Sequence, residues 1–326
     1  MNGPMCLADR NDAGCGLRGR TALVTGGARG IGFATARRLV GHGVTTTILD
    51  IDGEALESAR RDLEAAGHAE AAGHGEADAR AADGAAGGAD AGAARVFAHR
   101  CDVTKPEELR ATVERAAAEM GRIDILINNA GTLTGGAFHE QRPEAQRRLI
   151  EVNITSVVAL TRLVLPRMLQ NGRGHVVNVA SAASTLGVPD LAVYTATKWA
   201  VWGLTESLRH EARNAGHRQI GFSSVHPNYV ASGLFEGAGI PGLGGLLVPR
   251  IRSHDEVARA VVEKCLRRGR RQVFIPRGVR LAVLLRGLLP YPLFLRVVRT
   301  LGVHRSMAGW RGREVGSDAG ADQRNS

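Results

Sequence analysis

A strand, a glycine turn and a helix are encoded in Thr21-Ala22-Leu23-Val24-Thr25-Gly26-Gly27-Ala28-Arg29-Gly30-Ile31-Gly32-Phe33-Ala34-Thr35-Ala36-Arg37-Arg38-Leu39-Val40. The first five residues are apolar or β-branched and predict a buried strand, and the last eight have a helical pattern. The turn has the spacing G-x-x-x-G-x-G, in which glycines let the backbone approach a pyrophosphate that rests on the helix N-terminus. This order predicts a dinucleotide site, and a glycine-rich turn without a nucleotide is the less favoured interpretation.

A carboxylate stands at the end of the next predicted strand, Thr45-Thr46-Thr47-Ile48-Leu49, eighteen residues beyond Gly32. Asp50 can accept hydrogen bonds from both hydroxyls of a ribose and would repel a 2′-phosphate, which favours NAD over NADP. Arg29 in the glycine turn acts in the opposite direction, because a guanidinium can bind a phosphate. We predict NAD because the end of this strand should lie closest to the 2′ position, and NADP stays open as the alternative.

Three further side chains have the spacing of a proton-transfer site. Tyr194 and Lys198 are four residues apart, so they share one face of a helix, and Ser181 precedes the tyrosine by thirteen residues. An ammonium beside a phenol favours the phenolate and lowers the pKa of the tyrosine from its usual value of about 10. A tyrosine tuned in this way exchanges a proton with an alcohol or a ketone. Tyr-x-x-x-Lys alone is a weak pattern, and its weight comes from the dinucleotide signal upstream.

The chain resembles the short-chain dehydrogenase/reductase family over roughly residues 18 to 276. The likeness rests on several motifs in the family's order. They are Thr25-Gly26-Gly27-Ala28-Arg29-Gly30-Ile31-Gly32, Cys101-Asp102-Val103 after a third strand, Asn128-Asn129-Ala130-Gly131 after a fourth, Asn153 in Val-Asn-Ile-Thr-Ser, and the set Ser181, Tyr194 and Lys198. The alternation of strands and helices agrees with a parallel sheet covered on both faces. The resemblance implies an α/β fold, a Rossmann-type doubly wound parallel sheet in a single domain, and an NAD(P)-dependent oxidoreductase acting on CH–OH groups.

The resemblance also implies a role for each site residue. Tyr194 would be the general acid/base, Ser181 would hold the substrate oxygen, and Lys198 would tune the tyrosine and hold the nicotinamide ribose. Asn153 would connect the lysine to solvent through water, or would simply satisfy backbone groups at a helix bend. The predicted cofactor contacts are Gly26, Arg29, Gly30, Ile31, Gly32, Asp50, Asp102, Val103, Asn129, Ala130, Gly131, Tyr194, Lys198, Pro227, Val230 and Ser232. No metal site is predicted.

The segment after the strand at 220–225 departs from the family's pattern. The family usually has Pro-Gly followed by Val-x-Thr, and this chain has His226-Pro227-Asn228-Tyr229-Val230-Ala231-Ser232. Asparagine tolerates the left-handed backbone region better than most residues, which would let the turn survive. Ser232 keeps a hydroxyl where the family has threonine, and His226 is expected to be structural.

The segment at 233–249, where the family carries its lid, is apolar, with Glu236 as its only charge. Glycines within it would let it move. An apolar lid predicts a lipophilic secondary alcohol or ketone as substrate, of the steroid, retinoid or long-chain alcohol type. The closest alternative is an NADP-dependent ketoreductase of acyl or polyketide intermediates. A non-catalytic nucleotide-sensing binding protein is an alternative of another class, and the complete catalytic set argues against it.

Composition divides the chain into three parts. With 44% hydrophobic and 23% charged residues in 326, the chain has the make-up of a soluble globular protein with one sizeable core. Residues 1–17 are predicted to be a flexible tail, 18–276 the catalytic domain, and 277–326 a basic, apolar extension. Within the catalytic domain, residues 65–94 form a low-complexity segment that has little to bury and is predicted to be a mobile insertion. Four cysteines without metal-ligand spacing favour a cytoplasmic location.

Positive charge is concentrated near the C-terminus. Residues 247–313 contain sixteen Lys or Arg and three acidic residues, a local balance of +13 in a chain whose total is +10. Apolar runs too short to span a membrane lie between these cations. Two interpretations remain: peripheral contact with an anionic membrane surface, or, somewhat favoured, packing of the leucines on the body or a partner subunit. Nucleic acid is not an expected partner, since no binding motif occurs and 4% of residues are aromatic. The resemblance also implies a homodimer or homotetramer.

Overall fold

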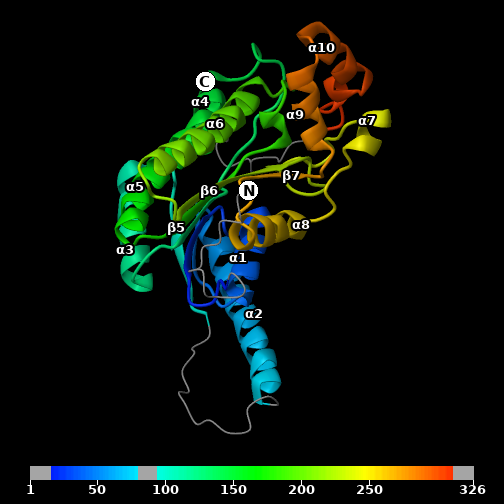
Figure 1. Ribbon diagram of the computed structural model, residues 1–326. Coiled ribbons are helices and arrows are strands. Elements are labelled where there is room, and N and C mark those ends of the chain that lie inside the picture. The colour runs from blue at the N-terminus through cyan, green and yellow to red at the C-terminus, as the bar shows by residue number, and fades with distance from the viewer. Residues whose placement is uncertain (1–15, 80–93, 311–326) are drawn as a thin grey trace, which may run out of the picture.

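Seven parallel strands form one sheet in the order β3-β2-β1-β4-β5-β6-β7. The computed structural model in Figure 1 describes residues 16–79 and 94–310. The strands are β1 (Thr21–Thr25), β2 (Thr45–Asp50), β3 (Val96–Arg100), β4 (Ile125–Asn128), β5 (Gly174–Val179), β6 (Ile220–Pro227) and β7 (Gln272–Ile275). Val24 pairs with Ile48 of β2 on one side and with Ile127 of β4 on the other. The strand order reverses between β1 and β4, which is where doubly wound sheets bind their ligands, and the predicted Rossmann-type fold is confirmed.

Helices cover both faces of this sheet, and Figure 1 shows them as two layers. One layer contains α1 (Gly30–Gly41), α2 (Gly53–Ala79), α8 (His254–Arg259) and the π-helical η3 (Ala260–Arg267). The other contains α3 (Pro106–Met120), α5 (Ser156–Gln170) and α6 (Ala192–Asn214). Each layer encloses its own apolar core. Leu39, Ile48 and Val261 belong to the first core, and Leu109, Leu126 and Phe222 belong to the second.

Shorter elements line the carboxyl ends of the strands. They are α4 (Pro143–Ile150), the π-helical η1 (Glu151–Thr155), the 3-10 turn η2 (Ala182–Ser184) and α7 (Gly242–Leu247). Beyond β7 the chain forms α9 (Val279–Leu288), α10 (Tyr291–Thr300) and the 3-10 turn η4 (Val303–Arg305). In Figure 1 α7, α9 and α10 gather at one end of the molecule, and the last turns of α2 lie at the opposite end.

The structure differs from the sequence interpretation at two segment boundaries. Leu17, which was assigned to the flexible tail, is 3% exposed and packs into the first core, so the folded body includes it. Helix α2 continues through Ala79, into the segment that was predicted to be a low-complexity insertion. Alanine is the best helix former, which explains how a stretch with little to bury can extend a helix. Positions 1–15, 80–93 and 311–326 lie outside the described residues.

The C-terminal extension, residues 277–326, packs onto the body through its described part. Val279, Phe294, Val303 and Met307 are all buried. The Tyr229 hydroxyl donates a hydrogen bond to Ser306 Oγ at 3.0 Å. The apolar residues of this extension therefore do not share one environment, because several of its leucines remain exposed.

The continuous helical segment at 143–170, comprising α4, η1 and α5, is long and apolar enough to cross a membrane by length and composition. One apolar side of it nevertheless faces the protein. Leu160, Val164 and Met168 are buried in the second core, against the sheet. We therefore interpret it as a core helix of the α/β fold.

Candidate active site

The glycine turn forms a close backbone cradle between β1 and α1. Gly26 has φ +63°, and a Cβ there would lie 2.9 Å from Asn129 Nδ2. A Cβ at Gly32 would collide with the Gly26 carbonyl oxygen. The first turn of α1 carries no acidic residue, and no side chain caps its N-terminus. Its amide groups are therefore open to an anion, so the cradle fits the pyrophosphate of a dinucleotide.

Asp50 lies at the carboxyl end of β2, beside this turn. Its Oδ2 accepts a hydrogen bond from the Ala28 amide at 3.1 Å, and its Oδ1 accepts one from the Asp52 amide at 3.3 Å. Arg29 forms an ion pair with Asp52, a residue that the sequence analysis did not single out. The pKa of Asp52 is lowered by the hydrogen bond from the Ala55 amide and by Arg29, with burial acting in the opposite direction. The guanidinium that could have bound a 2′-phosphate is thus engaged by a carboxylate.

The Asn-Asn-Ala-Gly motif joins the fourth strand to the glycine turn. Asn129 Nδ2 donates to the carbonyl oxygens of Thr25 and Gly26 at 3.0 and 3.1 Å. The amides of Asn129 and Ala130 both donate to Thr25 Oγ1 at 3.0 Å. Thr25, which is 2% exposed, therefore connects the two strands at the crevice. The hydrogen bonds of this motif hold the glycine turn in shape, and the contact of its residues with a cofactor remains a prediction.

Asp102 and Val103 follow β3, on the far side of Asp50. Asp102 Oδ1 accepts hydrogen bonds from the amide and hydroxyl of Thr104, and Arg148 Nη2 donates to Oδ2 at 3.1 Å. Burial acts to raise the pKa of Asp102, but the bonds from Thr104 and Arg148 outweigh it, so the pKa is lowered. Val103 packs against the second core. The predicted contact of these residues with an adenine remains a prediction.

Ser181 follows β5 and is the N-cap of η2. Its Oγ accepts a hydrogen bond from the Ala183 amide at 3.2 Å and is also hydrogen-bonded to the Tyr194 side chain. Ser184, the competing serine, is used elsewhere, because its hydroxyl donates to the Ser181 carbonyl and bonds His226 Nδ1. His226 Nε2 in turn contacts Ser224 Oγ at 2.9 Å. The structure brings Ser181 to the tyrosine and places His226 behind it as a buried support.

Tyr194 and Lys198 lie on the first turns of α6, and both are buried. Lys198 Nζ lies 5.8 Å from the centroid of the Tyr194 ring and donates to the Val179 carbonyl oxygen at 3.0 Å. Burial raises the pKa of Tyr194, and the hydrogen bond with Ser181 only partly offsets this. Burial also lowers the pKa of Lys198 to about 8.

The sequence predicted a lowered pKa for Tyr194, and for the protein without a bound ligand this prediction is wrong. Charging either group inside an apolar environment costs free energy, and at this separation that cost outweighs the attraction between them. A lysine with a pKa of about 8 does, however, exchange protons near neutral pH.

Asn153 occupies η1, the π-helical turn between α4 and α5. Its Oδ1 accepts from the Thr132 amide at 2.8 Å, and its Nδ2 donates to the Thr132 carbonyl at 3.0 Å and to Thr197 Oγ1 at 3.3 Å. A Cβ at Gly131 would lie 3.4 Å from Asn153 Oδ1 and 3.7 Å from Lys198 Nζ, so the amide and the ammonium flank this glycine. The backbone-satisfying role allowed for Asn153 is present, and its water-relay role remains a prediction.

The corner after β6 differs from the sequence interpretation. Asn228 has no left-handed backbone conformation, since Asp190 is the one non-glycine residue with positive φ in the described part of the chain. Instead, Asn228 Nδ2 donates to the carbonyl oxygens of Val248 and Pro249, both at 3.1 Å. This asparagine fastens the end of the lid segment (residues 233–249) to the sheet.

The predicted cofactor residues of this corner have unequal environments. Val230 is buried and bridges to Ile251, whereas Ser232 is exposed. His254 lies between the glycine turn and the lid segment, because a Cβ at Gly30 would be 3.6 Å, and one at Gly233 3.5 Å, from its Nε2. Sequence reasoning missed His254, and no local pattern around it would have placed it there.

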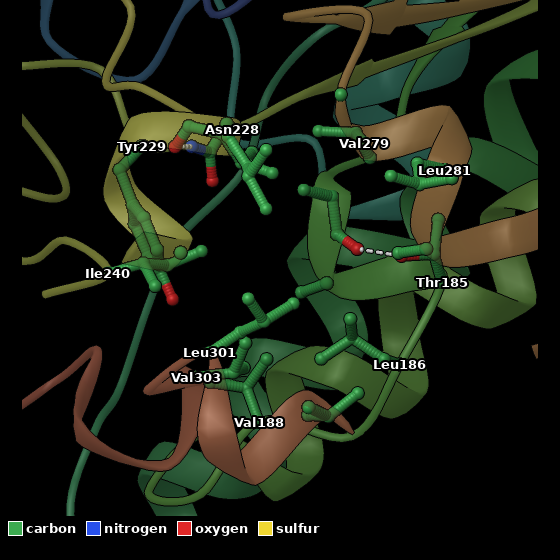
Figure 2. Close-up of a pocket in the computed structure, with 18 of the residues that line it drawn as sticks. Thr185, Leu186, Val188, Asn228, Tyr229, Ile240, Val279, Leu281, Leu301 and Val303 are labelled. Atoms are coloured by element: carbon green, nitrogen blue, oxygen red, sulfur yellow. Dashed lines mark hydrogen bonds between the residues drawn. The ribbon is translucent and has the colours of Figure 1, made fainter. Parts of the chain in front are cut away.

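An apolar pocket adjoins Ser181. It lies between the η2 loop, the lid segment and the C-terminal extension. Figure 2 shows Ile240 and Tyr229 on one side, Val279 and Leu281 on the other, and Val188 with Leu301 and Val303 below. Pockets with such an apolar lining suit ligands that are mostly hydrocarbon.

Phe235 of the lid segment separates this pocket from the tyrosine. Its ring packs edge-on against Tyr194, with 5.6 Å between ring centroids, and against Tyr229 at 5.3 Å. Phe235 lines the pocket and Tyr194 does not. Trp310 Nε1 donates to the Leu234 carbonyl at 3.2 Å, so the end of the described chain holds the lid segment in this position.

Within the described residues no group of three or more His, Cys, Asp or Glu side chains could hold a metal ion. The site is thus a dinucleotide cradle, a serine–tyrosine–lysine set and an adjoining apolar pocket, which together define an NAD(P)-dependent oxidoreductase.

Comparison with known proteins agrees with this class. The family model for short chain dehydrogenases matches residues 20–86 and 76–239. Human retinol dehydrogenase 10 is 31% identical over 301 residues, which cover 89% of this chain and 84% of that protein. A short-chain dehydrogenase/reductase from Burkholderia phymatum in complex with NAD is 26% identical with a TM-score of 0.67, covering 83% of this chain and 94% of that one. A metagenomic short-chain oxidoreductase in complex with NADP is 29% identical with a TM-score of 0.61, covering 80% and 98%.

The chain belongs to the short-chain dehydrogenase/reductase family. It is an oxidoreductase that acts on CH–OH groups with NAD(P). This finding argues against the non-catalytic nucleotide sensor considered from the sequence.

Proposed function

We propose that this enzyme transfers a hydride between NAD(H) and a lipophilic alcohol or its carbonyl product, of the retinoid, steroid or long-chain type. The observation that carries the proposal is the apolar lining of the pocket that reaches Ser181. The names of the related retinol dehydrogenases support the same substrate class. A polar sugar would leave its hydroxyls without partners among such side chains.

The residues of the site have distinct tasks in this proposal. Bound NAD⁺ supplies the hydride acceptor when an alcohol is oxidised. Burial keeps Tyr194 protonated, so the phenol first passes its own proton towards the neutral amine of Lys198. The Tyr194 oxygen then takes the hydroxyl proton of the alcohol, and the Ser181 hydroxyl holds the substrate oxygen as charge develops on it. Lys198, with its pKa of about 8, receives or returns protons behind the tyrosine and holds the ribose. Asn153 keeps the loop at Thr132 beside the lysine.

NAD is the proposed cofactor, with NADP as the alternative. Asp50 at the end of β2 accepts amide hydrogen bonds from the glycine turn, and Arg29 is already paired with Asp52. An NADP-dependent ketoreductase of acyl or polyketide intermediates would need Arg29 to be released for the 2′-phosphate. Titration of the purified protein with NADH and with NADPH decides between the two.

The catalytic proposal is tested by Tyr194→Phe, which removes one hydroxyl and keeps the ring that packs against Phe235. We expect retinol or long-chain alcohol oxidation, followed by NADH absorbance, to fall by about a thousandfold or more while NADH affinity is kept. Tyr291→Phe, at an exposed tyrosine of α10, is the matched control and should leave turnover unchanged. Turnover that survives Tyr194→Phe would refute the mechanism.

We also propose a cytoplasmic protein that contacts membranes peripherally through the C-terminal extension, and that forms a homodimer or homotetramer. The extension supports the first part by combining exposed leucines with arginines. A shallow apolar hollow formed by α4, η1 and α6 supports the second, since Phe138 and Ile150 are exposed there. Cell fractionation and sedimentation velocity, respectively, test these two assignments.

A further inference from the structure

The pocket opens at a place where apolar side chains meet solvent. Among the residues that line it, Leu247 at the end of α7 and Leu281 on α9 are the exposed ones, at 50% and 45%. The two lie close together, because a side chain at Gly278, just before α9, would collide with the Leu247 carbonyl oxygen. The mouth of the pocket is therefore framed by the lid segment and by the first turn of α9.

The surface around this mouth is also apolar. Leu284 and Leu288 follow Leu281 at helical spacing on the same face of α9, and they are 55% and 69% exposed. Leu246 on α7, next to Leu247, is also exposed and adds to this surface. We call these residues together the rim: Leu246, Leu247, Leu281, Leu284 and Leu288. In water so many neighbouring exposed leucines are unfavourable, which indicates that a partner covers them.

The charges at the rim identify the chemistry of that partner. No Asp or Glu occurs between Lys264 and Arg313, while residues 264–310 contain eleven Lys or Arg. Arg280 on α9 and Arg296 and Arg299 on α10 are exposed, and none of them forms an ion pair with a carboxylate of the described residues. Leucines beside unpaired arginines match the two layers of an anionic phospholipid surface, which offers hydrocarbon next to phosphate. A second protein surface would have to supply an acidic rim around an apolar centre.

We propose that the rim docks on an anionic bilayer and that the pocket mouth between Leu247 and Leu281 faces the lipid, so that the substrate enters from the membrane and not from water. The inference rests on the proposed function, because it concerns how a lipophilic alcohol reaches Ser181. A path through the rim keeps such a substrate in an apolar environment from the bilayer to the pocket. Arg286 holds α9 in place on the inner side. Its guanidinium donates to the Thr185 carbonyl at 3.0 Å and lies 4.2 Å from the Trp199 ring centroid.

Docking is tested by cosedimentation of the full chain with vesicles of phosphatidylcholine, with and without phosphatidylglycerol. We expect binding to the anionic vesicles, and a loss of about tenfold or more in the double variant Arg280→Gln, Arg299→Gln. The matched control Arg110→Gln, Arg115→Gln removes the same charge from exposed positions of α3 and should bind like the wild type. Equal losses in both double variants would show a nonspecific effect of net charge and would overturn the proposal, as would a wild type that stays in the supernatant.

Entry from the bilayer is tested with two substrates, retinol dissolved in the anionic vesicles and a short water-soluble secondary alcohol. Leu284→Ser, Leu288→Ser alters the rim but no residue that lines the pocket. We expect this variant to lose about tenfold or more of the rate on vesicle-borne retinol, and to keep its rate on the soluble alcohol within about twofold. Unchanged rates on vesicle-borne retinol would overturn the entry path. Sedimentation velocity gives the oligomeric state of both proteins. A wild type that is a dimer and a variant that is a monomer would assign the rim to a second copy of the chain, and would also overturn the proposal.

These measurements separate the inference from the function on which it rests. Vesicle binding requires no turnover, so a protein that docks but oxidises no alcohol refutes the proposed function alone. A protein that oxidises the soluble alcohol but does not dock refutes the membrane inference alone.

Discussion

Arg29 and Asp52 show how one ion pair alters the meaning of a motif. In the sequence Arg29 stands inside the glycine turn, where a guanidinium would favour a 2′-phosphate. In the structure it contacts Asp52, two residues beyond the carboxylate expected to bind the ribose. Both side chains are close to half exposed, so the pair contributes little to the stability of the fold. We propose that its effect is on the choice of cofactor, because the pair occupies the one cation of the turn.

Two substitutions test this assignment. Asp50→Ser removes the carboxylate beside the turn, and we expect NADH to bind about tenfold or more weakly, since hydrogen bonds to a charged group are worth about 1.5–3 kcal/mol. Asp52→Asn keeps the shape but frees Arg29, and we expect NADPH to bind several-fold more tightly with NADH little changed. Fluorescence titration with each reduced cofactor measures both effects. If NADPH gains nothing when Asp52 is changed, Arg29 has no part in cofactor selection.

Site residues could be predicted from the sequence where a regular spacing along the chain brings them together, and could not be predicted where only the tertiary structure does. Ser181, Tyr194 and Lys198 were found because helical spacing and a fixed interval encode their meeting. Asp52 was not, since a pairing across a turn depends on side-chain direction and not on spacing. Asn228 was noticed as a departure from the family's pattern, but its bonds to Val248 and Pro249 come from a tertiary contact with the lid segment. For the same reason the pKa of Tyr194 was predicted in the wrong direction: burial is a property of the folded molecule.

Strand β6 and the η2 loop are joined by a buried histidine. His226 contacts Ser184 Oγ at 2.7 Å and Ser224 Oγ at 2.9 Å, and its ring stacks on Phe274 and meets Trp202 edge-on. Burial lowers the pKa of His226 to about 3, and a hydrogen bond with the Ser181 backbone opposes this only in part. On the neighbouring strand β5, burial and the charge of Arg209 lower the pKa of His175 to about 4. Both side chains are therefore neutral in the folded enzyme.

Acid should destabilise this part of the fold through the two histidines. In the unfolded chain both histidines bind protons below the ordinary histidine pKa of about 6.5. In the folded chain they do so only near pH 4 or below. The free energy of unfolding therefore falls as pH falls from about 6.5 towards 4. Each histidine lowers the free energy of unfolding by roughly 3 kcal/mol at most over that pH range. Urea unfolding at several pH values should show that the free energy of unfolding falls less steeply with falling pH in His226→Asn than in the wild type. His139→Asn, at an exposed histidine, should keep the wild-type dependence on pH. Identical slopes in all three proteins would contradict the prediction.

Across the whole molecule, the strand and helix order was predictable and the placement of the C-terminal extension was not. Alternating strand and helix patterns fix a parallel sheet, and β1 has the predicted bounds. The mixture of leucines and arginines after β7 fits both packing and membrane contact, because composition does not say which leucine faces the body. The structure divides them between the two environments, with Phe294 and Val303 buried and Leu284 and Leu288 exposed.

If the extension is part of the main folding unit, damage to its buried contacts should destabilise the entire enzyme. Phe294 is 3% exposed and lines the pocket from α10, whereas its neighbour Leu295 is 45% exposed. We expect Phe294→Ala to lower the free energy of unfolding by about 3–5 kcal/mol, through lost burial and a cavity, and to preserve a single transition. Leu295→Ala, one residue away on the outer face, should cost less than about 1 kcal/mol. Urea unfolding followed by tryptophan fluorescence and by circular dichroism measures both, and two separate transitions in the wild type would show instead that the extension folds independently of the sheet.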